Sequence, residues 1–220
     1  MLKTVEEIGR VVQNAHFFNP QNWSREAMPS TVEGSPVEAV TRFFALLAER
    51  QVDYALVGGV ALLHYVKGRN TQDLDLIIAG EDLDRLPEIE IAERDVYFAR
   101  GRFQGLRVDF LLTDNPLFRR VQREYVRRER LLGQGVPLAT VEGLLLLKLY
   151  ALPSLYRQGD FVRVGLYEND VAVLVYEYEP DMERLLDILA EYVGEGDMTA
   201  LREIVAEIEE RVRRFKGGSR

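Results

Sequence analysis

The sequence of 220 residues contains no cysteine and only two histidines, His16 and His64. Without cysteine, the chain forms no disulfide and offers no thiolate to a metal or a substrate, which fits a reducing compartment. Two histidines leave a structural zinc site almost without nitrogen or sulfur ligands. Metal chemistry in this chain would therefore depend on oxygen ligands.

Long apolar runs are missing as well. The longest, LLLLKLYAL at residues 144–152, is far shorter than the roughly 20 residues that a membrane-spanning helix needs. The first ten residues, MLKTVEEIGR, carry charge and lack the apolar stretch of a secretion signal. We therefore expect a cytoplasmic protein that makes no contact with a membrane.

The net charge of −8 argues against binding nucleic acid over the whole surface. Residues 119–130, RRVQREYVRRER, are an exception, because six arginines stand there against only two glutamates. We expect this segment to be a helix. Two interpretations remain open: the helix binds RNA, or it is an ordinary solvated face.

The coarse pattern predicts an α+β fold, with a small mixed β-sheet core and flanking helices, followed by a helical C-terminal half. Three regions are expected: an N-terminal extension (1–36), a core (37–135) and a helical region (136–220). Strands are expected at 53–57, 74–79, 96–99 and 106–112, with a strand or loop near 89–91. Helices are expected at 36–50, 60–66, 119–130, 143–152, 167–177, 181–192 and 198–215, with Pro153 ending the fourth.

Three aspartates stand out because they interrupt apolar strands. Asp73 and Asp75 alternate with leucines and so point to one face, while Asp109 lies between Val108 and Phe110. If the two strands are adjacent, three carboxylates converge, and their repulsion raises the pKa of at least one unless cations neutralise it. Oxygen ligands alone suit Mg²⁺ or Mn²⁺. Two such ions can stabilise the attacking and leaving oxygens of a phosphoryl displacement.

A glycine pair, Gly58 and Gly59, follows the first expected strand. We interpret it as a turn. Because glycine has no side chain, the backbone N–H groups there can approach a phosphate chain closely. The helix that follows adds the positive end of its dipole.

Together these residues resemble the nucleotidyltransferase superfamily with the DNA polymerase β-like fold. The shared pattern is an apolar residue and two glycines, a helix, R-x-T-x-D-x-D and a later strand with a central aspartate. The matching residues are Gly58, Gly59, Arg69, Thr71, Asp73, Asp75 and Asp109. The stretch RNTQDLDL (69–76) looks most like the AbiEii/AbiGii-type toxins and related small nucleotidyltransferases. The segments at 141–152 and 167–175 are similar to those where such proteins place a lysine and a later aspartate, here Lys148 and Asp170.

The resemblance, which covers residues 52–175, implies an enzyme that moves a nucleoside monophosphate from an NTP to a hydroxyl group. It implies that Asp73 and Asp75 bind both metal ions, Mg²⁺ or Mn²⁺. Asp109 would complete the site of the second ion and act as general base toward the acceptor. Gly58 and Gly59 would hold the β- and γ-phosphates of the NTP.

The acceptor stays open. The resemblance favours RNA, such as a tRNA 3′ end, or a protein hydroxyl, in a toxin–antitoxin or phage-defence system with an antitoxin protein as partner. A small molecule such as an aminoglycoside is an alternative acceptor. A different class of function is a catalytically silent module that binds a nucleotide or a partner protein.

Secondary candidates each have a structural alternative. Arg69 can pair with the acidic cluster, reach a triphosphate or act as a cation at a helix end. Thr71, counted with the cofactor-binding residues, can bond the backbone at the entrance of the strand or serve in a turn. Lys148 can contact a phosphate, form a salt bridge with one of the site aspartates or extend its amine to solvent from an apolar helix. For Asp170, pairing or capping within the helical half is favoured, and for His64 a place on a helix surface.

Overall fold

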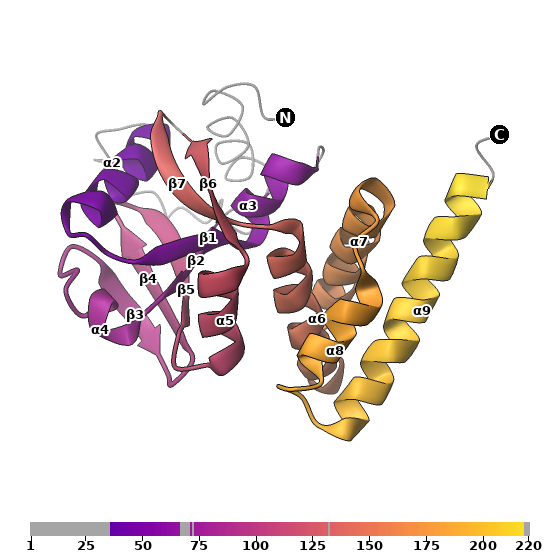
Figure 1. The fold of residues 1–220 in the computed structure, drawn as a ribbon. Helices are drawn as coiled ribbons and strands as arrows, with labels where there is room; N and C mark the ends of the chain where they lie inside the picture. Colours follow the sequence, from indigo (N-terminus) through magenta and orange to yellow (C-terminus); the bar gives the residue numbers. More distant parts are fainter. Residues whose placement is uncertain (1–35, 67–70, 72, 132, 218–220) are drawn as a thin grey trace, which may run out of the picture. The chain divides into compact units, whose positions relative to one another are not determined.

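The structure is a computed structural model that describes residues 36–66, 71, 73–131 and 133–217 (Figure 1). The chain divides into two compact units, Met1–Ala139 and Thr140–Arg220. The boundary expected after residue 135 falls inside a strand of the first unit. Arg69 and the expected N-terminal extension (1–36) lie outside the described residues, except for Pro36.

The described part of the first unit contains a seven-stranded sheet with the order β3-β4-β5-β2-β1-β7-β6. The pairs β2–β5 and β1–β7 are parallel and the other neighbours are antiparallel, so the sheet is mixed as expected. The strands are β1 (Tyr54–Val57), β2 (Leu74–Ile78), β3 (Glu90–Arg94), β4 (Phe98–Phe103), β5 (Leu106–Leu112), β6 (Val126–Leu131) and β7 (Gln134–Ala139).

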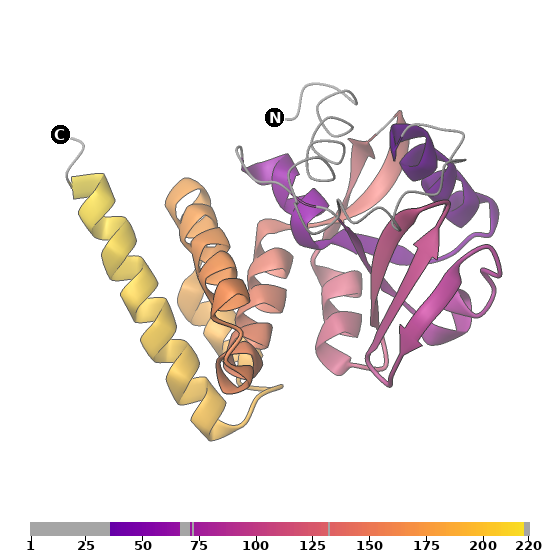
Figure 2. The same cartoon turned by 180° about the vertical axis from the view of Figure 1, so that it is seen from behind.

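Helices cover both faces of this sheet (Figures 1 and 2). They are α2 (Pro36–Glu49), α3 (Gly58–Tyr65), α4 (Gly80–Leu83) and α5 (Pro116–Glu124). On one face Phe43 of α2 packs against Phe103 of β4, with ring centroids 5.3 Å apart. On the opposite face Phe118 of α5 packs edge-on against Phe98, at 5.4 Å. Because Phe98 and Phe103 are an odd number of residues apart on one strand, they identify the two faces.

The second unit consists of α6 (Val141–Gln158), α7 (Phe161–Tyr178), α8 (Met182–Leu189) and α9 (Glu195–Gly217). Side chains cap the first three of these helices, as when the Thr140 hydroxyl accepts a hydrogen bond from Gly143 N. The α+β class with a helical C-terminal half is thus confirmed. Within the described ranges, no helix is both long and apolar enough to span a membrane.

Several expected elements were wrong in detail. Helix α6 continues through Pro153, because its packing against α7, α8 and α9 outweighs the hydrogen bond that proline cannot donate. The glycine pair is not a turn but the first two residues of α3. The arginine-rich segment 119–130 is not one helix: α5 ends at Glu124, and β6 begins at Val126.

Candidate active site

The structure brings two of the three aspartates together. Asp75 of β2 and Asp109 of β5 are register partners in a parallel pair, so their side chains leave the sheet on the same face. On β5 this face alternates with the buried side chains of Val108 and Phe110. The apolar pattern of β5 places Asp109 on this face, and the pairing of β5 with β2 places it beside Asp75.

The glycine pair fits closely against this aspartate. Gly58 has a φ of +62°, and a Cβ atom added to it would lie 1.9 Å from Oδ2 of Asp75. The next glycine, Gly59, donates a backbone hydrogen bond to the same oxygen at 3.3 Å. A Cβ on Gly59 would lie 2.3 Å from Oγ1 of Thr71. Both glycines are thus required so that the start of α3 can approach Asp75 and Thr71.

A guanidinium group holds the second aspartate. Nε of Arg100, on β4, donates to Oδ1 of Asp109 at 2.9 Å, and Nη1 lies 3.4 Å from Oε2 of Glu93 on β3. The hydrogen bond and the charge of Asp109 raise the pKa of Arg100 above its ordinary value. A β-bulge at Ala92 makes this contact possible, since it brings Glu93 opposite Arg100 in the ladder.

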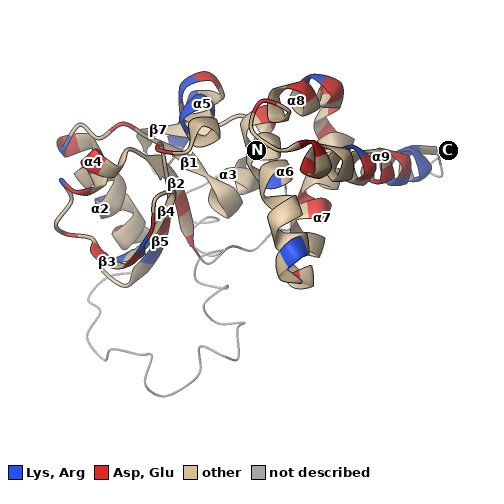
Figure 3. Cartoon of the chain, turned by 90° about the horizontal axis from the view of Figure 1, so that it is seen from below, with Lys and Arg blue, Asp and Glu red and all other residues tan. Residues whose placement is uncertain are grey.

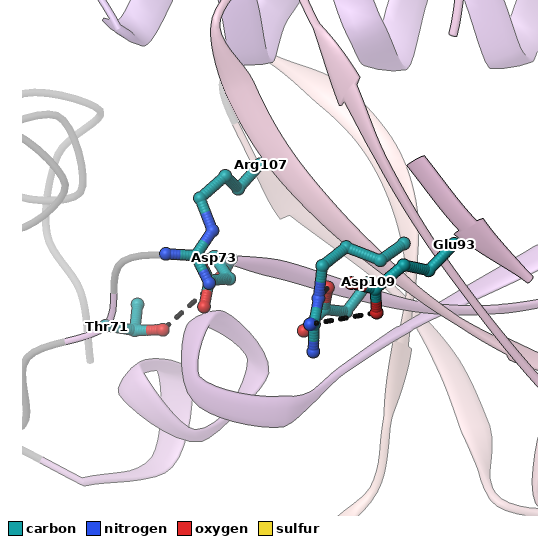
Figure 4. Close-up of polar contacts among 6 residues, drawn as sticks. Thr71, Asp73, Glu93, Arg107 and Asp109 are labelled. Carbon is teal, nitrogen blue, oxygen red and sulfur yellow. Dashed lines mark hydrogen bonds and ion pairs between the residues drawn. The ribbon is translucent and has the colours of Figure 1, made fainter. Parts of the chain in front are cut away.

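Asp73 has a cationic neighbour as well (Figure 4). Nε of Arg107 lies 3.0 Å from Oδ1 of Asp73, and Arg107 stands two residues before Asp109 on the same face of β5. The hydroxyl of Thr71 donates to the backbone carbonyl of Asp73 at 3.3 Å. This bond is the closing contact at the start of β2 that the sequence allowed for Thr71.

The donor set has the right chemistry for a divalent cation, since three carboxylates suit Mg²⁺ or Mn²⁺. The arrangement does not fit as it stands. Among the described residues, no three histidine or acidic side chains are placed to hold one metal ion. Arg100 and Arg107 instead form ion pairs with Asp109 and Asp73.

Comparison with known proteins supports the fold assignment. The chain resembles the solution structure of the antibiotic-resistance factor ANT(2'')-Ia with a TM-score of 0.51 and 14% identity, over 80% of this chain and 96% of that one. The two chains share a fold. No protein-family model and no curated protein matches the sequence.

Two further solved structures are similar at a lower level. One is an antigenic nucleotidyltransferase-like protein from Paracoccidioides brasiliensis, with a TM-score of 0.46, 18% identity and coverage of 76% of this chain and 91% of that one. The other is ANT(2'')-Ia in complex with adenylyl-2''-tobramycin, with a TM-score of 0.47, 14% identity and coverage of 77% and 98%.

In the helical unit, Lys148 is buried against an aspartate. Its Nζ lies 2.7 Å from Oδ2 of Asp170 and 4.3 Å from the centroid of the Tyr167 ring. Their side chains are 7% and 2% exposed, so the two charges stabilise each other away from water. Asp170 thus pairs within the helical half, as favoured from the sequence. Binding of phosphate by Lys148 stays a prediction.

The segment 119–130 presents its arginines on two different elements. On β6, Arg128 and Arg130 share one face and are exposed, while Arg127 on the other face lies 2.9 Å from Glu129. His64 of α3 lies 3.4 Å from Arg127, and burial lowers the pKa of its imidazole. This position at the end of α3 agrees with a structural role for His64.

Sequence reasoning missed three charged residues of the site: Glu93, Arg100 and Arg107. The alternation of LRVDFLL already places Arg107 on the face of Asp109. It gives no sign of Arg100 or Glu93, because their place depends on which strands pair and in what register.

Proposed function

We propose that the protein is a nucleotidyltransferase that moves a nucleoside monophosphate from an NTP to a hydroxyl acceptor. The oxygen of the acceptor would form a bond to the α-phosphorus, the bond from that phosphorus to the bridging oxygen would break, and pyrophosphate would leave. The observation that carries the proposal is the register of Asp75 and Asp109 on adjacent parallel strands, beside the backbone of Gly58 and Gly59. The likeness to ANT(2'')-Ia supports the fold.

The proposed roles follow the positions of the side chains. Asp109 would accept the proton of the acceptor hydroxyl, and Gly58 and Gly59 would present backbone N–H groups to the phosphates of the NTP. Thr71, beside Gly59, is a further proposed nucleotide contact. The resemblance implies a divalent cation, Mg²⁺ or Mn²⁺, on Asp73, Asp75 and Asp109. In the described arrangement Arg107 and Arg100 pair with two of these carboxylates, so we assign no step to the cation.

For the acceptor, the toxin-like stretch at 69–76 supports RNA, such as a tRNA 3′ end, or a protein hydroxyl. The corresponding role would be the toxin of a toxin–antitoxin or phage-defence system in the cytoplasm, with an antitoxin as partner. The exposed arginines of α5 and β6 would supply a surface for RNA. The likeness of fold to ANT(2'')-Ia keeps a small-molecule acceptor such as an aminoglycoside as the alternative.

The test is transfer of label from each of the four α-³²P-labelled NTPs to total RNA, to protein and to aminoglycosides. We expect the parent to label one of them and Asp75→Asn to lose at least about a hundredfold in rate. Asparagine keeps an oxygen that can accept the hydrogen bond from Gly59, so we expect this variant to fold. The matched control is Asp187→Asn in the helical unit, an exposed aspartate. Equal labelling by the parent and Asp75→Asn would refute the assignment.

One observation favours a second candidate, the catalytically silent module. Two of the three carboxylates are already neutralised by arginines, which a purely structural site would also show. Such a module would bind an NTP, or a partner protein, without transferring label. Titration with a non-hydrolysable NTP beside the transfer assay separates the two: binding without transfer in every acceptor class supports the module.

A further inference from the structure

The carboxylate of Asp109 is held through one of its two oxygens. Arg100 on β4 and Asp109 on β5 are register partners, so the pairing of the two strands places their side chains next to each other. Nε of Arg100 donates to Oδ1 at 2.9 Å, and among the described residues this is the one hydrogen bond that the Asp109 side chain accepts. Since this side chain is 26% exposed, a substrate can reach Oδ2.

A second carboxylate holds the other end of Arg100. Its Nη1 lies 3.4 Å from Oε2 of Glu93, which the bulge at Ala92 brings opposite Arg100 in the ladder (Figure 4). A guanidinium is planar and rigid, so two carboxylates that contact different nitrogens fix both its position and its plane. Asp109 therefore receives its hydrogen bond from a donor that is itself held in place.

The charge of this arginine also acts on its neighbours in the sheet, whose strands carry both signs of charge in Figure 3. Successive register pairs across β2, β5, β4 and β3 join Asp75, Asp109, Arg100 and Glu93. The carboxylates of Asp75 and Asp109 repel each other, and the guanidinium between Asp109 and Glu93 offsets that repulsion. Both ion pairs of Arg100 are partly exposed, so they contribute little to stability. The arrangement therefore orients a carboxylate more than it stabilises the fold.

We propose that Arg100 is a positioning residue for Asp109 and that Glu93 fixes Arg100 in this role. The inference rests on the proposed function, in which Asp109 accepts the proton of the acceptor hydroxyl, and it assigns no step to a metal ion. Because Nε–H of Arg100 occupies Oδ1, the proton goes to Oδ2. The O–H bond of the acceptor breaks as its oxygen bonds to the α-phosphorus, and pyrophosphate leaves with the electrons of the bridging bond.

Steady-state transfer by the full chain, with the labelled NTP and the acceptor class that the parent uses, tests this role. Arg100→Gln removes the guanidinium, so kcat should fall about tenfold to a hundredfold because Asp109 loses its orientation. The KM for the NTP should change less than about threefold. Glu93→Gln should lower kcat by about twofold to fivefold. The matched control is Arg102→Gln, an exposed arginine two residues from Arg100 on the same face, which should change kcat less than about twofold.

Two further variants separate the orientation of Asp109 from a general loss of structure. In an Asp109→Asn background, Arg100→Gln should have no further effect on the residual rate, because the two residues act as a unit. Arg100→Lys should recover part of the lost kcat, because its amine still donates to Asp109 but lacks the planar fork. In urea denaturation, Arg100→Gln and Arg102→Gln should unfold at the same midpoint, since both arginines contribute little to stability.

The outcomes distinguish this inference from the proposed function. If the parent transfers label and Arg100→Gln keeps its kcat, or loses no more than Arg102→Gln, the positioning role is refuted and the enzyme stands. Independent effects of Arg100→Gln and Asp109→Asn on the rate would have the same meaning. Absence of transfer by the parent to every acceptor class would refute the proposed function, and the positioning role with it.

Discussion

Asp75 and Asp109 stand opposite each other on the parallel strands β2 and β5. The sheet reaches this arrangement through chain segments that are more than 30 residues apart, with α4 and the β3–β4 pair between them. Because neighbouring strands in register point their side chains the same way, the relationship depends on backbone pairing and not on the ions around it. The predictions below test the surroundings of this pair and the stability of the two units.

The first prediction concerns the close approach of α3 to Asp75. Gly58→Ala should destabilise the protein in urea denaturation, because its Cβ meets Asp75 at 1.9 Å and its φ is +62°. The matched control is Gly105→Ala, with a φ of +81° and nothing within 4 Å of the added Cβ. The control should cost about 1–2 kcal/mol of backbone strain, and Gly58→Ala about 1–3 kcal/mol more through overpacking. Equal losses of stability in Gly58→Ala and Gly105→Ala would show that the Asp75 side chain moves away from the added Cβ at no cost.

The second prediction concerns the buried ion pair of the helical unit. Lys148→Met should lower the free energy of unfolding by about 3–5 kcal/mol, because it leaves the Asp170 carboxylate buried without its lysine. Adding Asp170→Leu should restore most of that loss. Urea denaturation followed by circular dichroism measures both, with Arg202→Met, in an exposed pair with Glu183, as the control. Failure of the double variant to recover would contradict the pairing.

The third prediction concerns alkaline pH. Burial raises the pKa of Tyr54 to about 12, against 10.0 for a free tyrosine. Between these values the unfolded chain releases a proton that the folded one retains, so stability should fall as pH rises from 10 toward 12. Its slope should be shallower by about 1 kcal/mol per pH unit in Tyr54→Phe. Denaturation at several pH values, together with absorbance titration of the phenolate, measures this difference. Parallel slopes in the parent and the variant would argue against it.

The fourth prediction concerns the exposed arginines of β6. If RNA is the acceptor, Arg128→Glu combined with Arg130→Glu should reduce its labelling and lower the dependence of binding on salt by about one unit of slope per lost phosphate contact. The control is Arg213→Glu, an exposed arginine of α9. Labelling measured from low to physiological salt decides the matter. If the dependence of binding on salt concentration is unchanged in the double variant, β6 does not contact RNA and is an ordinary solvated edge strand.

Much of the first unit could be predicted because its strands alternate regularly. The alternation in β2 and β5 placed the aspartates on one face, and the strands indeed pair in parallel. Strands were expected at 96–99 and 106–112, and the structure joins β4 and β5 there in a hairpin whose turn falls at Gln104 and Gly105, both with positive φ. Alternation in the sequence predicts the two faces of a strand correctly because the apolar face must be buried in the folded sheet.

The end of the sheet was missed for physical reasons. β7 contains Gly135 and Pro137, which lower strand propensity. Pairing with β1 and β6 holds it in the sheet nonetheless. In β6, the run of arginines has no apolar alternation and suggested a helix. Both segments are strands because they pair with other strands in the folded sheet. The sequence of either segment alone does not reveal that pairing.

The counterions of the site could not be predicted at all. The contact of Arg100 with Glu93 exists because a bulge shifts β3 by one residue, and a bulge leaves no mark in the sequence EIAER. The aspartates were visible as isolated charges in apolar strands. Their cationic neighbours were visible only as ordinary charged residues of a hairpin.

The strand order also has a consequence for how molecules meet. Among the described residues, the outer strands of the sheet, β3 and β6, each have a neighbouring strand on one side only. The free side of such a strand is where another chain could add a strand. Arginines along β6 would face one another in such a contact, and the bulge in β3 interrupts the regular spacing of donors and acceptors there. Both features oppose the joining of two copies edge to edge into fibres.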